Sequence, residues 1–366
     1  MSDNYAAYRA RTRFANLDGL RFICIAMVLW HHAQPVSGDL SPALSRGFLG
    51  VDFFFVLSGY LITTLLLREA DRFGHFNLKH FYIRRLIRIV PVYFLVVGAV
   101  SFYYVVIKGE TELAALIPYY VLFLSNFLTE HIPTLEMTWS LAVEEQYYLL
   151  WPLLLLVVPL RLLIPFALVL VALNVALAPL DLGYAPQTEA PVRIALPYAT
   201  YAPILMGSLL AIALHLGRSF DLIDRLLGWR GAALAGFLVL GLTMHLAPAD
   251  VRGLPNFVIH SVMTAILAAL VLRERGDFMA TLRQPRIARV GAVSYGIYLY
   301  HLIALDITQR VLDRVGLAEA WLILFAYSAL AIAIAEVSFR TLEAYFRRFR
   351  PKPPPAPAAR PIGEGR

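Results

Sequence analysis

An arginine and two histidines lie in the mostly apolar segment "LDGLRFICIAMVLWHHAQ" (17–34). Arg21 and His32 are almost a whole number of helical turns apart, so both face one side of a helix, at depths about 16 Å apart. His31 points about 100° away from that side. Ionisable groups inside a bilayer are costly and usually bind or react with something. Arg21 is therefore a candidate anion ligand, and His32 is a candidate general base or nucleophile.

Three acidic residues lie in two further apolar segments. Asp52 stands in "GFLGVDFFFVLSGYLIT", and Glu144 and Glu145 stand in "TWSLAVEEQYYLLWP". Adjacent helix positions differ by about 100°, so one glutamate can face a bundle interior while the other points elsewhere. A carboxylate beside an imidazole fixes its tautomer, so Asp52 or Glu145 is the predicted partner of His32. The two glutamates are equally consistent with structural pairs to arginines.

The segment "HFYIRRLIRIVPVYF" begins with a cluster of arginines. Arg85 and Arg88 lie one turn apart on one face of a helix, and Arg84 also lies one turn from Arg88. Guanidinium groups arranged in this way suit phosphate. We interpret Arg84 as a cytoplasmic loop charge rather than a ligand. The predicted phosphate site is therefore formed by Arg21, Arg85 and Arg88.

A polar stripe follows the segment "SYGIYLYHL". Ser294, Tyr298 and His301 have the spacing i, i+4, i+7 of one helix face, and we predict that they contact the substrate. His301 and His260 are equally consistent with histidines whose hydrogen bonds are satisfied in a core. Aromatic residues near the glutamates are interpreted as packing or interfacial residues: Tyr147, Tyr148 and Trp151.

Membrane helices are the elements that must position these residues. Hydrophobic residues make up 59% of the 366 residues, and apolar runs such as 149–180 and 255–272 recur along the chain. A soluble all-α protein has no need of repeated runs of about 20 apolar residues. The net charge of +7 indicates basic cytoplasmic loops and not nucleic-acid binding. Cys24 is the only cysteine, so we expect no intramolecular disulfide and no metal site, and we find no removable signal peptide.

The sequence predicts an all-α polytopic membrane protein with about ten transmembrane helices. The predicted helices cover residues 17–36, 47–67, 86–107, 140–159, 162–178, 198–216, 231–247, 255–273, 290–309 and 320–342. The apolar stretch 113–128 is short and contains Pro118. We interpret it as a re-entrant or surface helix rather than as an eleventh span.

The charges of the connecting segments predict the orientation. With the N-terminus inside, the basic residues of 68–88 and 273–289 fall in the cytoplasm, and the acidic loop 108–138 falls outside. Ten spans then place both termini in the cytoplasm. Residues 1–345 are predicted to form one transmembrane domain, and the basic Pro/Ala-rich residues 346–366 a disordered tail.

Five motifs in this order resemble the acyltransferase-3 family of membrane acyltransferases. They are "LDGLRFICIAMVLWHH", "GFLGVDFFFVLSGYLIT", "RRLIRIVPVY", "TWSLAVEEQYYLLWP" and "SYGIYLYHL". Arg21 and His32 match the arginine–ten residues–histidine spacing of that family, and Arg85 and Arg88 match its R-x-x-R motif. Each motif is weak alone, but five in family order between residues 17 and 342 are specific.

The resemblance implies a ten-helix enzyme that uses cytoplasmic acyl-CoA, often acetyl-CoA. Such an enzyme O-acylates a glycan, a lipid-linked sugar or another hydroxyl acceptor at the bacterial inner membrane. The resemblance also implies that His32 is catalytic and that Arg21, Arg85 and Arg88 are essential. Since the chain ends soon after the tenth predicted span, it looks like the stand-alone form without an SGNH hydrolase-like domain.

The mechanism and one rival function stay open in the sequence. His32 is expected to act either as a general base on the acceptor hydroxyl or as a covalent carrier of the acyl group. The rival function is a transporter or flippase for a glycan or polar lipid, in which intramembrane charges bind substrate or protons. No inverted repeat is visible, and an arginine cluster has less purpose in such a protein.

Overall fold

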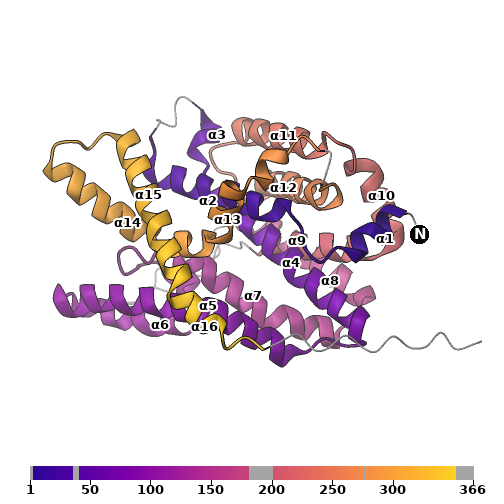
Figure 1. The fold of residues 1–366 in the computed structure, drawn as a ribbon, viewed down its shortest axis with the longest axis horizontal. Coiled ribbons are helices and arrows are strands. Elements are labelled where there is room, and N and C mark those ends of the chain that lie inside the picture. The colour runs from indigo at the N-terminus through magenta and orange to yellow at the C-terminus, as the bar shows by residue number, and fades with distance from the viewer. Residues whose placement is uncertain (1–2, 36–40, 181–200, 275–276, 352–366) are drawn as a thin grey trace, which may run out of the picture.

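Figure 1 shows the computed structural model of the protein, which describes residues 3–35, 41–180, 201–274 and 277–351. Within these ranges the chain is helical and has no strand, so the all-α prediction is confirmed. The α-helices are α1 (Asp3–Ala10), α2 (Asn16–Ala33), α3 (Pro42–Ser45), α4 (Leu49–Phe73), α5 (Leu78–Ser101), α6 (Ile117–Val121), α7 (Thr138–Val157), α8 (Leu160–Leu177), α9 (Ala202–His215), α10 (Gly217–Leu227), α11 (Ala232–Leu246), α12 (Leu254–Leu272), α13 (Pro285–Ala292), α14 (Ser294–Arg314), α15 (Ala320–Arg340) and α16 (Leu342–Arg347).

Five helices in the described ranges are long and apolar enough to cross a membrane, or up to seven if each sharply bent pair forms one span. The bent pairs are α9 with α10, at 108°, and α13 with α14, at 72°. A helix overlaps each of the ten predicted segments, but the count of about ten spans is not confirmed. Two features explain the difference: α2 and α7 carry ionisable residues, and α11 has only 15 residues.

The apolar stretch 113–128 is not one helix. It is divided among a 3₁₀ turn at Thr111–Leu116, helix α6 and a second 3₁₀ turn at Ser125–Phe127. None of these pieces has the length of about 20 residues that a membrane span needs. At the other end of the chain, α16 ends at Arg347, and the predicted disordered tail lies mostly outside the described residues.

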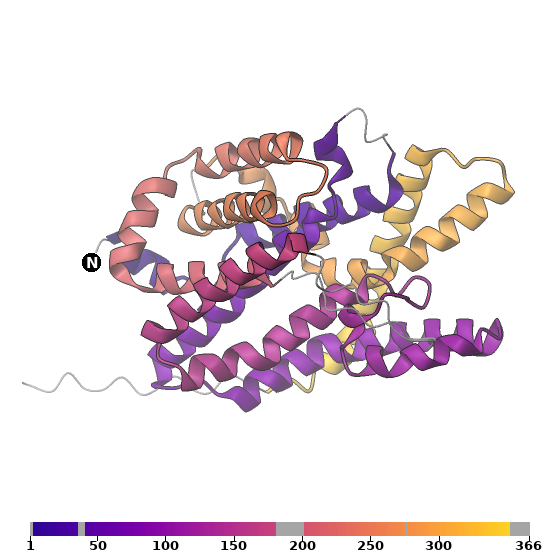
Figure 2. The same cartoon turned by 180° about the vertical axis from the view of Figure 1, so that it is seen from behind.

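The other helices lie in three regions around α2 and α4 (Figures 1 and 2). Helices α5 and α7 run along one side of the molecule in both views, whereas α14 and α15 form a hairpin at one end. Helices α1, α10, α11 and α12 lie at the opposite end from that hairpin. Helices α2 and α4 lie between these regions and contact helices from each of them.

Helices α4 and α9 pack closely because each presents a glycine to the backbone of the other. A Cβ atom on Gly59 would meet the carbonyl oxygen of Ile204, and one on Gly207 would meet the carbonyl oxygen of Val56. Small residues let helix backbones approach in this way in membranes. The contact fixes α4 against the bundle, so that Ser58 on its other side faces α7.

The N-terminal segment folds back onto the bundle. The hydroxyl of the buried Tyr8 lies 3.0 Å from the hydroxyl of Tyr60 in α4. Arg68 of α4 donates to the backbone carbonyls of Tyr8 and Arg11, and Arg11 donates to the carbonyl of Val271 at 2.5 Å. This mostly polar and basic segment is therefore a packed part of the fold.

Candidate active site

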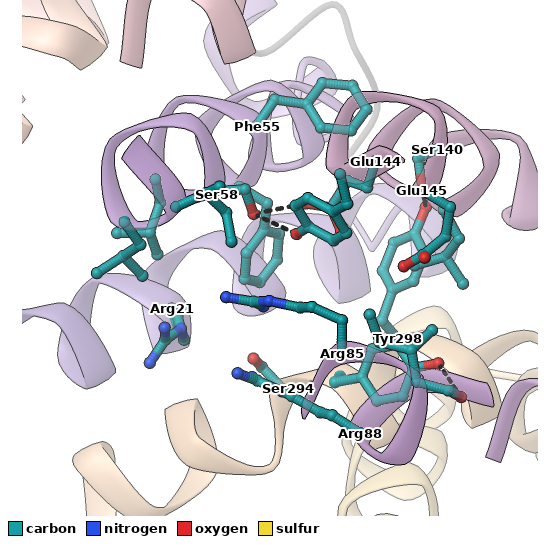
Figure 3. Close-up of a pocket in the computed structure, with 18 of the residues that line it drawn as sticks. Arg21, Phe55, Ser58, Arg85, Arg88, Ser140, Glu144, Glu145, Ser294 and Tyr298 are labelled. Atoms are coloured by element: carbon teal, nitrogen blue, oxygen red, sulfur yellow. Dashed lines mark hydrogen bonds between the residues drawn. The ribbon is translucent and has the colours of Figure 1, made fainter. Parts of the chain in front are cut away.

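A cavity of about 240 Å³ lies among α2, α4, α5, α7 and α14 (Figure 3). We call it the arginine cavity. Its apolar lining comes mainly from α4. Its polar lining consists of Arg21, Ser58, Arg85, Arg88, Ser140, Glu144, Glu145, Tyr148, Ser294, Tyr295 and Tyr298.

Two arginines of this cavity form no direct ion pair with any described residue, although the carboxylates of Glu144 and Glu145 line the same cavity. Within the described ranges neither Arg85 nor Arg88 forms a hydrogen bond or an ion pair. The guanidinium carbon of Arg85 lies 5.1 Å from the ring centroid of Tyr148 and 5.7 Å from that of Phe81, so aromatic faces support it. A half-buried guanidinium whose N–H donors are unused favours binding of an anion that accepts hydrogen bonds from it. The pair is therefore suited to a phosphate or carboxylate ligand.

Arg21 supplies a third guanidinium from another helix. One of its nitrogens donates to Asp18 at 2.6 Å, one turn earlier in α2. Figure 3 shows Arg85 extending through the cavity toward Arg21, with Glu144 and Ser294 on opposite sides of it. The three arginines thus approach one another, as the sequence predicts for a phosphate site, although they come from two different helices.

Both glutamates of α7 line the arginine cavity. Glu144 accepts a hydrogen bond from the Ser58 hydroxyl at 2.6 Å, and Ser58 accepts one from the Tyr148 hydroxyl at 3.2 Å. This chain of hydrogen bonds ties α4 to α7. Glu145 lies in the same cavity and not beside His32. Carboxylates and arginines therefore share the site without direct ion pairs among its described residues.

Tyr298 connects the cavity to the histidines. Its hydroxyl lies 2.7 Å from that of Ser140 and donates to the Met137 carbonyl at 3.0 Å. Its ring centroid lies 5.4 Å from that of His301, one turn further along α14. The ring of His301 in turn lies 4.7 Å from the ring of His32. The aromatic rings therefore form a continuous path from the arginine cavity to His32.

The two histidine rings have their Nδ1 atoms fixed by backbone carbonyls. His32 Nδ1 lies 2.9 Å from the carbonyl oxygen of Val28, and His301 Nδ1 lies 2.6 Å from that of Tyr298. A carbonyl only accepts, so each Nδ1 carries a proton, and each neutral ring presents a lone pair at Nε2. Nε2 of the fully buried His301 has no hydrogen-bond partner in the described part of the chain. This buried Nε2 atom can accept a hydrogen bond from a hydroxyl group.

Asp52 contacts a different histidine from the one predicted. Its carboxylate lies 2.9 Å from Nε2 of His260 in α12, and both side chains are buried. The partner of His32 Nδ1 is the Val28 carbonyl. The structure thus corrects the predicted contact between His32 and a carboxylate, because Asp52 faces α12 and Glu145 lies in the arginine cavity. His260, considered above as a core histidine, is paired in the core.

The arginine cavity contains six of the nine predicted site residues, namely Arg21, Arg85, Arg88, Glu145, Ser294 and Tyr298. His301 contacts the lining residue Tyr298, and His32 contacts His301. Sequence reasoning missed Ser140 as a cavity residue and assigned Tyr148 to packing. The available signal was spacing, since Tyr148 lies one turn after Glu144. The roles of these residues in binding and catalysis stay predictions.

Comparison with known proteins identifies the family. A family model described as an acyltransferase domain matches residues 14–338. Peptidoglycan O-acetyltransferase OatA of Listeria monocytogenes serovar 1/2a is 30% identical over 362 residues, which cover 93% of this chain and 56% of that protein. The putative peptidoglycan O-acetyltransferase YrhL of Bacillus subtilis (strain 168) is 30% identical over 355 residues, 89% of this chain and 54% of that protein.

A third relative has the same pattern of coverage. A putative O-acetyltransferase of Staphylococcus aureus (strain COL) is 27% identical over 368 residues, which cover 94% of this chain and 59% of that protein. The chain thus spans a little over half the length of the curated relatives it matches. No solved structure matches it. Because the family model covers nearly all of the helical region, the chain belongs to the acyltransferase-3 family.

Proposed function

We propose that the chain transfers an acyl group, acetyl in the simplest case, from acyl-CoA to a hydroxyl of a glycan at the bacterial inner membrane. The observation that carries this proposal is the arginine cavity, in which Arg85 and Arg88 form no hydrogen bond and no direct ion pair among the described residues. Relatives named as peptidoglycan O-acetyltransferases support acetyl transfer and a peptidoglycan-type acceptor.

In this proposal the arginine cavity holds the diphosphate of CoA. Guanidinium groups donate two parallel hydrogen bonds to phosphate oxygens, and their charge does not depend on pH. A cavity of about 240 Å³ is too small for a whole CoA molecule, since pockets for drug-sized ligands start at about 300 Å³. The pantetheine arm therefore leaves toward Tyr298, and the nucleotide extends from the other side.

His32 acts at the outer end of this path. In the direct route, Nε2 takes the proton of the acceptor hydroxyl, and the oxygen attacks the thioester carbonyl. The carbon–sulfur bond then breaks, and the thiolate of CoA receives the proton from the imidazolium. The products are an O-acyl ester and free CoA. The hydrogen bond from Nδ1 to the Val28 carbonyl holds the ring in the tautomer that this step needs.

A covalent route uses the same nitrogen. Nε2 of His32 attacks the thioester carbonyl, the carbon–sulfur bond breaks, and the CoA thiolate takes a proton from the acyl-imidazolium. The acceptor hydroxyl then attacks the acyl-imidazole, its oxygen takes the acyl group, and its proton returns to the imidazole. The two routes differ in one observable. Only the covalent route releases one equivalent of CoA per enzyme before any acceptor is added, and rapid-mixing measurements of CoA release distinguish the two.

The proposed topology places both termini in the cytoplasm. The arginines then lie toward the cytoplasmic supply of acyl-CoA, and His32 near the end of α2 lies toward the outer surface. This arrangement agrees with the excess of Lys and Arg in the predicted inner loops. It lets one helix, α14, carry Ser294 and Tyr298 in the cavity and His301 beside His32.

The proposed donor site is tested by changing its arginines. We expect Arg85→Ala combined with Arg88→Ala to weaken CoA binding by about 10- to 100-fold, because each lost hydrogen bond to a charged group costs about 1.5 kcal/mol or more. Titration calorimetry of the purified full chain in nanodiscs measures the dissociation constant. Arg84→Ala is the matched control, since the adjacent Arg84 is paired with Glu69 at 3.4 Å. Equal CoA binding by the double variant and the control would contradict the assignment.

A further inference from the structure

A second cavity, of about 180 Å³, adjoins the arginine cavity on the side of the N-terminal segment. The two cavities share Arg21, Leu61 and Leu65 as lining residues. The remaining lining of the second cavity comes from the N-terminal segment, the start of α2 and the last part of α4. These residues are Thr12, Arg13, Phe14, Leu17, Asp18, Thr64 and Arg68.

The second cavity has an excess of positive charge. Asp18 is its one carboxylate, and it binds Arg13 at 3.0 Å and Arg21 at 2.6 Å. Arg68 is the third guanidinium, and its hydrogen bonds go to two backbone carbonyls of the N-terminal segment, which carry no net charge. Three guanidiniums against one carboxylate leave an excess of two positive charges in the lining. This excess matches a phosphate monoester, whose charge is about −1.5 to −2 at neutral pH.

The lining also offers groups that are free to rearrange around a ligand. The side chain of Arg13 is 82% exposed, so its contact with Asp18 is an exposed ion pair of low stability. Thr64 adds a buried hydroxyl beside the hydroxyls of Tyr8 and Tyr60. Phe14 is packed against Tyr60, with ring centroids 5.8 Å apart, and forms a fixed wall.

We propose that the second cavity binds the 3′-phosphate of the CoA nucleotide. This inference rests on the proposed function, in which the arginine cavity holds the diphosphate. CoA carries two separate phosphate groups, the diphosphate and the monoester on the ribose 3′-oxygen. Two basic cavities that share Arg21 therefore provide one site for each group. Arg13 is the residue that makes the second site specific for CoA over nucleotides without a 3′-phosphate.

The proposal is tested with two ligands that differ only in that phosphate. Titration calorimetry measures the dissociation constants of CoA and 3′-dephospho-CoA for the purified full chain in nanodiscs. We expect the wild type to bind CoA about tenfold more tightly, since one charge-assisted contact of about 1.4 kcal/mol corresponds to a factor of ten. Arg13→Ala lowers this preference to about threefold or less, and Arg13→Glu lowers it further.

Two comparisons keep the result interpretable. Arg218→Ala removes an exposed arginine of α10 outside both cavities, and it keeps the wild-type preference. If Arg13→Ala weakens both ligands equally, or if the wild type binds both equally, the second site is refuted while the donor assignment stands. If the wild type binds neither ligand, the proposed function itself fails. Retention of the full preference in Arg13→Glu would also overturn the assignment of Arg13.

Discussion

The adjacent residues His31 and His32 have different surroundings. The ring of His32 contacts His301, and its Nδ1 is held by the carbonyl of Val28. The ring of His31 lies between the ring of His32, at a centroid distance of 5.1 Å, and the ring of Phe48, at 5.6 Å. The spacing from Arg21 selects His32 in the sequence, and the structure places the same residue at the end of the aromatic path from the arginine cavity.

Exchanging one histidine at a time tests this distinction. We expect His32→Ala to lower kcat for acetyl transfer by about 10²- to 10⁴-fold, the usual contribution of general acid–base catalysis. CoA binding by this variant stays close to wild type, because His32 does not line the arginine cavity. His31→Ala is the control and keeps most of the activity. Turnover and calorimetry on the same preparations check both expectations, and near-normal turnover by His32→Ala would refute the role of this residue.

Single residues were predictable from sequence as far as helical spacing determines their position. Spacing gives the face of a residue on its own helix and its depth, and these suffice for Arg85, Arg88 and Tyr298. Spacing does not tell which neighbouring helix that face meets. Asp52 faces α12, so its partner is His260 and not His32. Contacts between helices follow from packing, which one sequence without its fold does not contain.

The Asp52–His260 pair is a connection between helices α4 and α12. Both side chains are at most 7% exposed, and their nearest polar atoms lie 2.9 Å apart. Removing one partner of a buried pair leaves the other without compensation, at a cost of about 3–5 kcal/mol. The pairing of Asp52 with His260 therefore accounts for an acidic residue in the apolar helix α4 that does not line the arginine cavity.

Thermal unfolding in detergent measures this contribution. We expect Asp52→Ala to lower the Tm by several degrees, and the double change with His260→Ala to cost less than the sum of the single changes. Cys24 is the only cysteine and is buried, so a thiol-reactive fluorophore reports unfolding directly. An unchanged Tm combined with a lost kcat in Asp52→Ala would show instead that this carboxylate acts in catalysis.

Among the elements, long apolar helices were the most predictable. A helix overlaps each of the ten predicted segments, because runs of apolar residues dominate the local pattern. The predicted segment 198–216 ends at the bend between α9 and α10, where Gly217 begins α10, but α10 itself was not predicted. The bend at Val293 lies inside the predicted segment 290–309 and was missed, since Val293 is neither a proline nor a glycine. Helix α1 was also missed. Its eight residues are polar on average, and their position depends on contacts with α4, α9 and α10.

On the scale of the whole molecule, the two cavities and the two histidines His301 and His32 lie next to one another in a row. The second cavity adjoins the arginine cavity at Arg21, the arginine cavity reaches Tyr298, and the ring of His301 connects Tyr298 to His32. Such an arrangement suits a long donor that binds at one end and reacts at the other. Residues separated by more than 250 positions in the chain create it, and this is why the sequence shows the groups but not their order in space.

Acetyl transfer by the purified chain tests the proposed function most directly. The experiment supplies acetyl-CoA with a labelled acetyl group and peptidoglycan fragments to the full chain in nanodiscs, and it measures free CoA and labelled ester. We predict that CoA release and base-labile label on the glycan appear together, and that both disappear in His32→Ala. The contradicting result is that the chain, reconstituted in vesicles, moves a glycan across the membrane and releases no CoA from acetyl-CoA. That result would support a transporter.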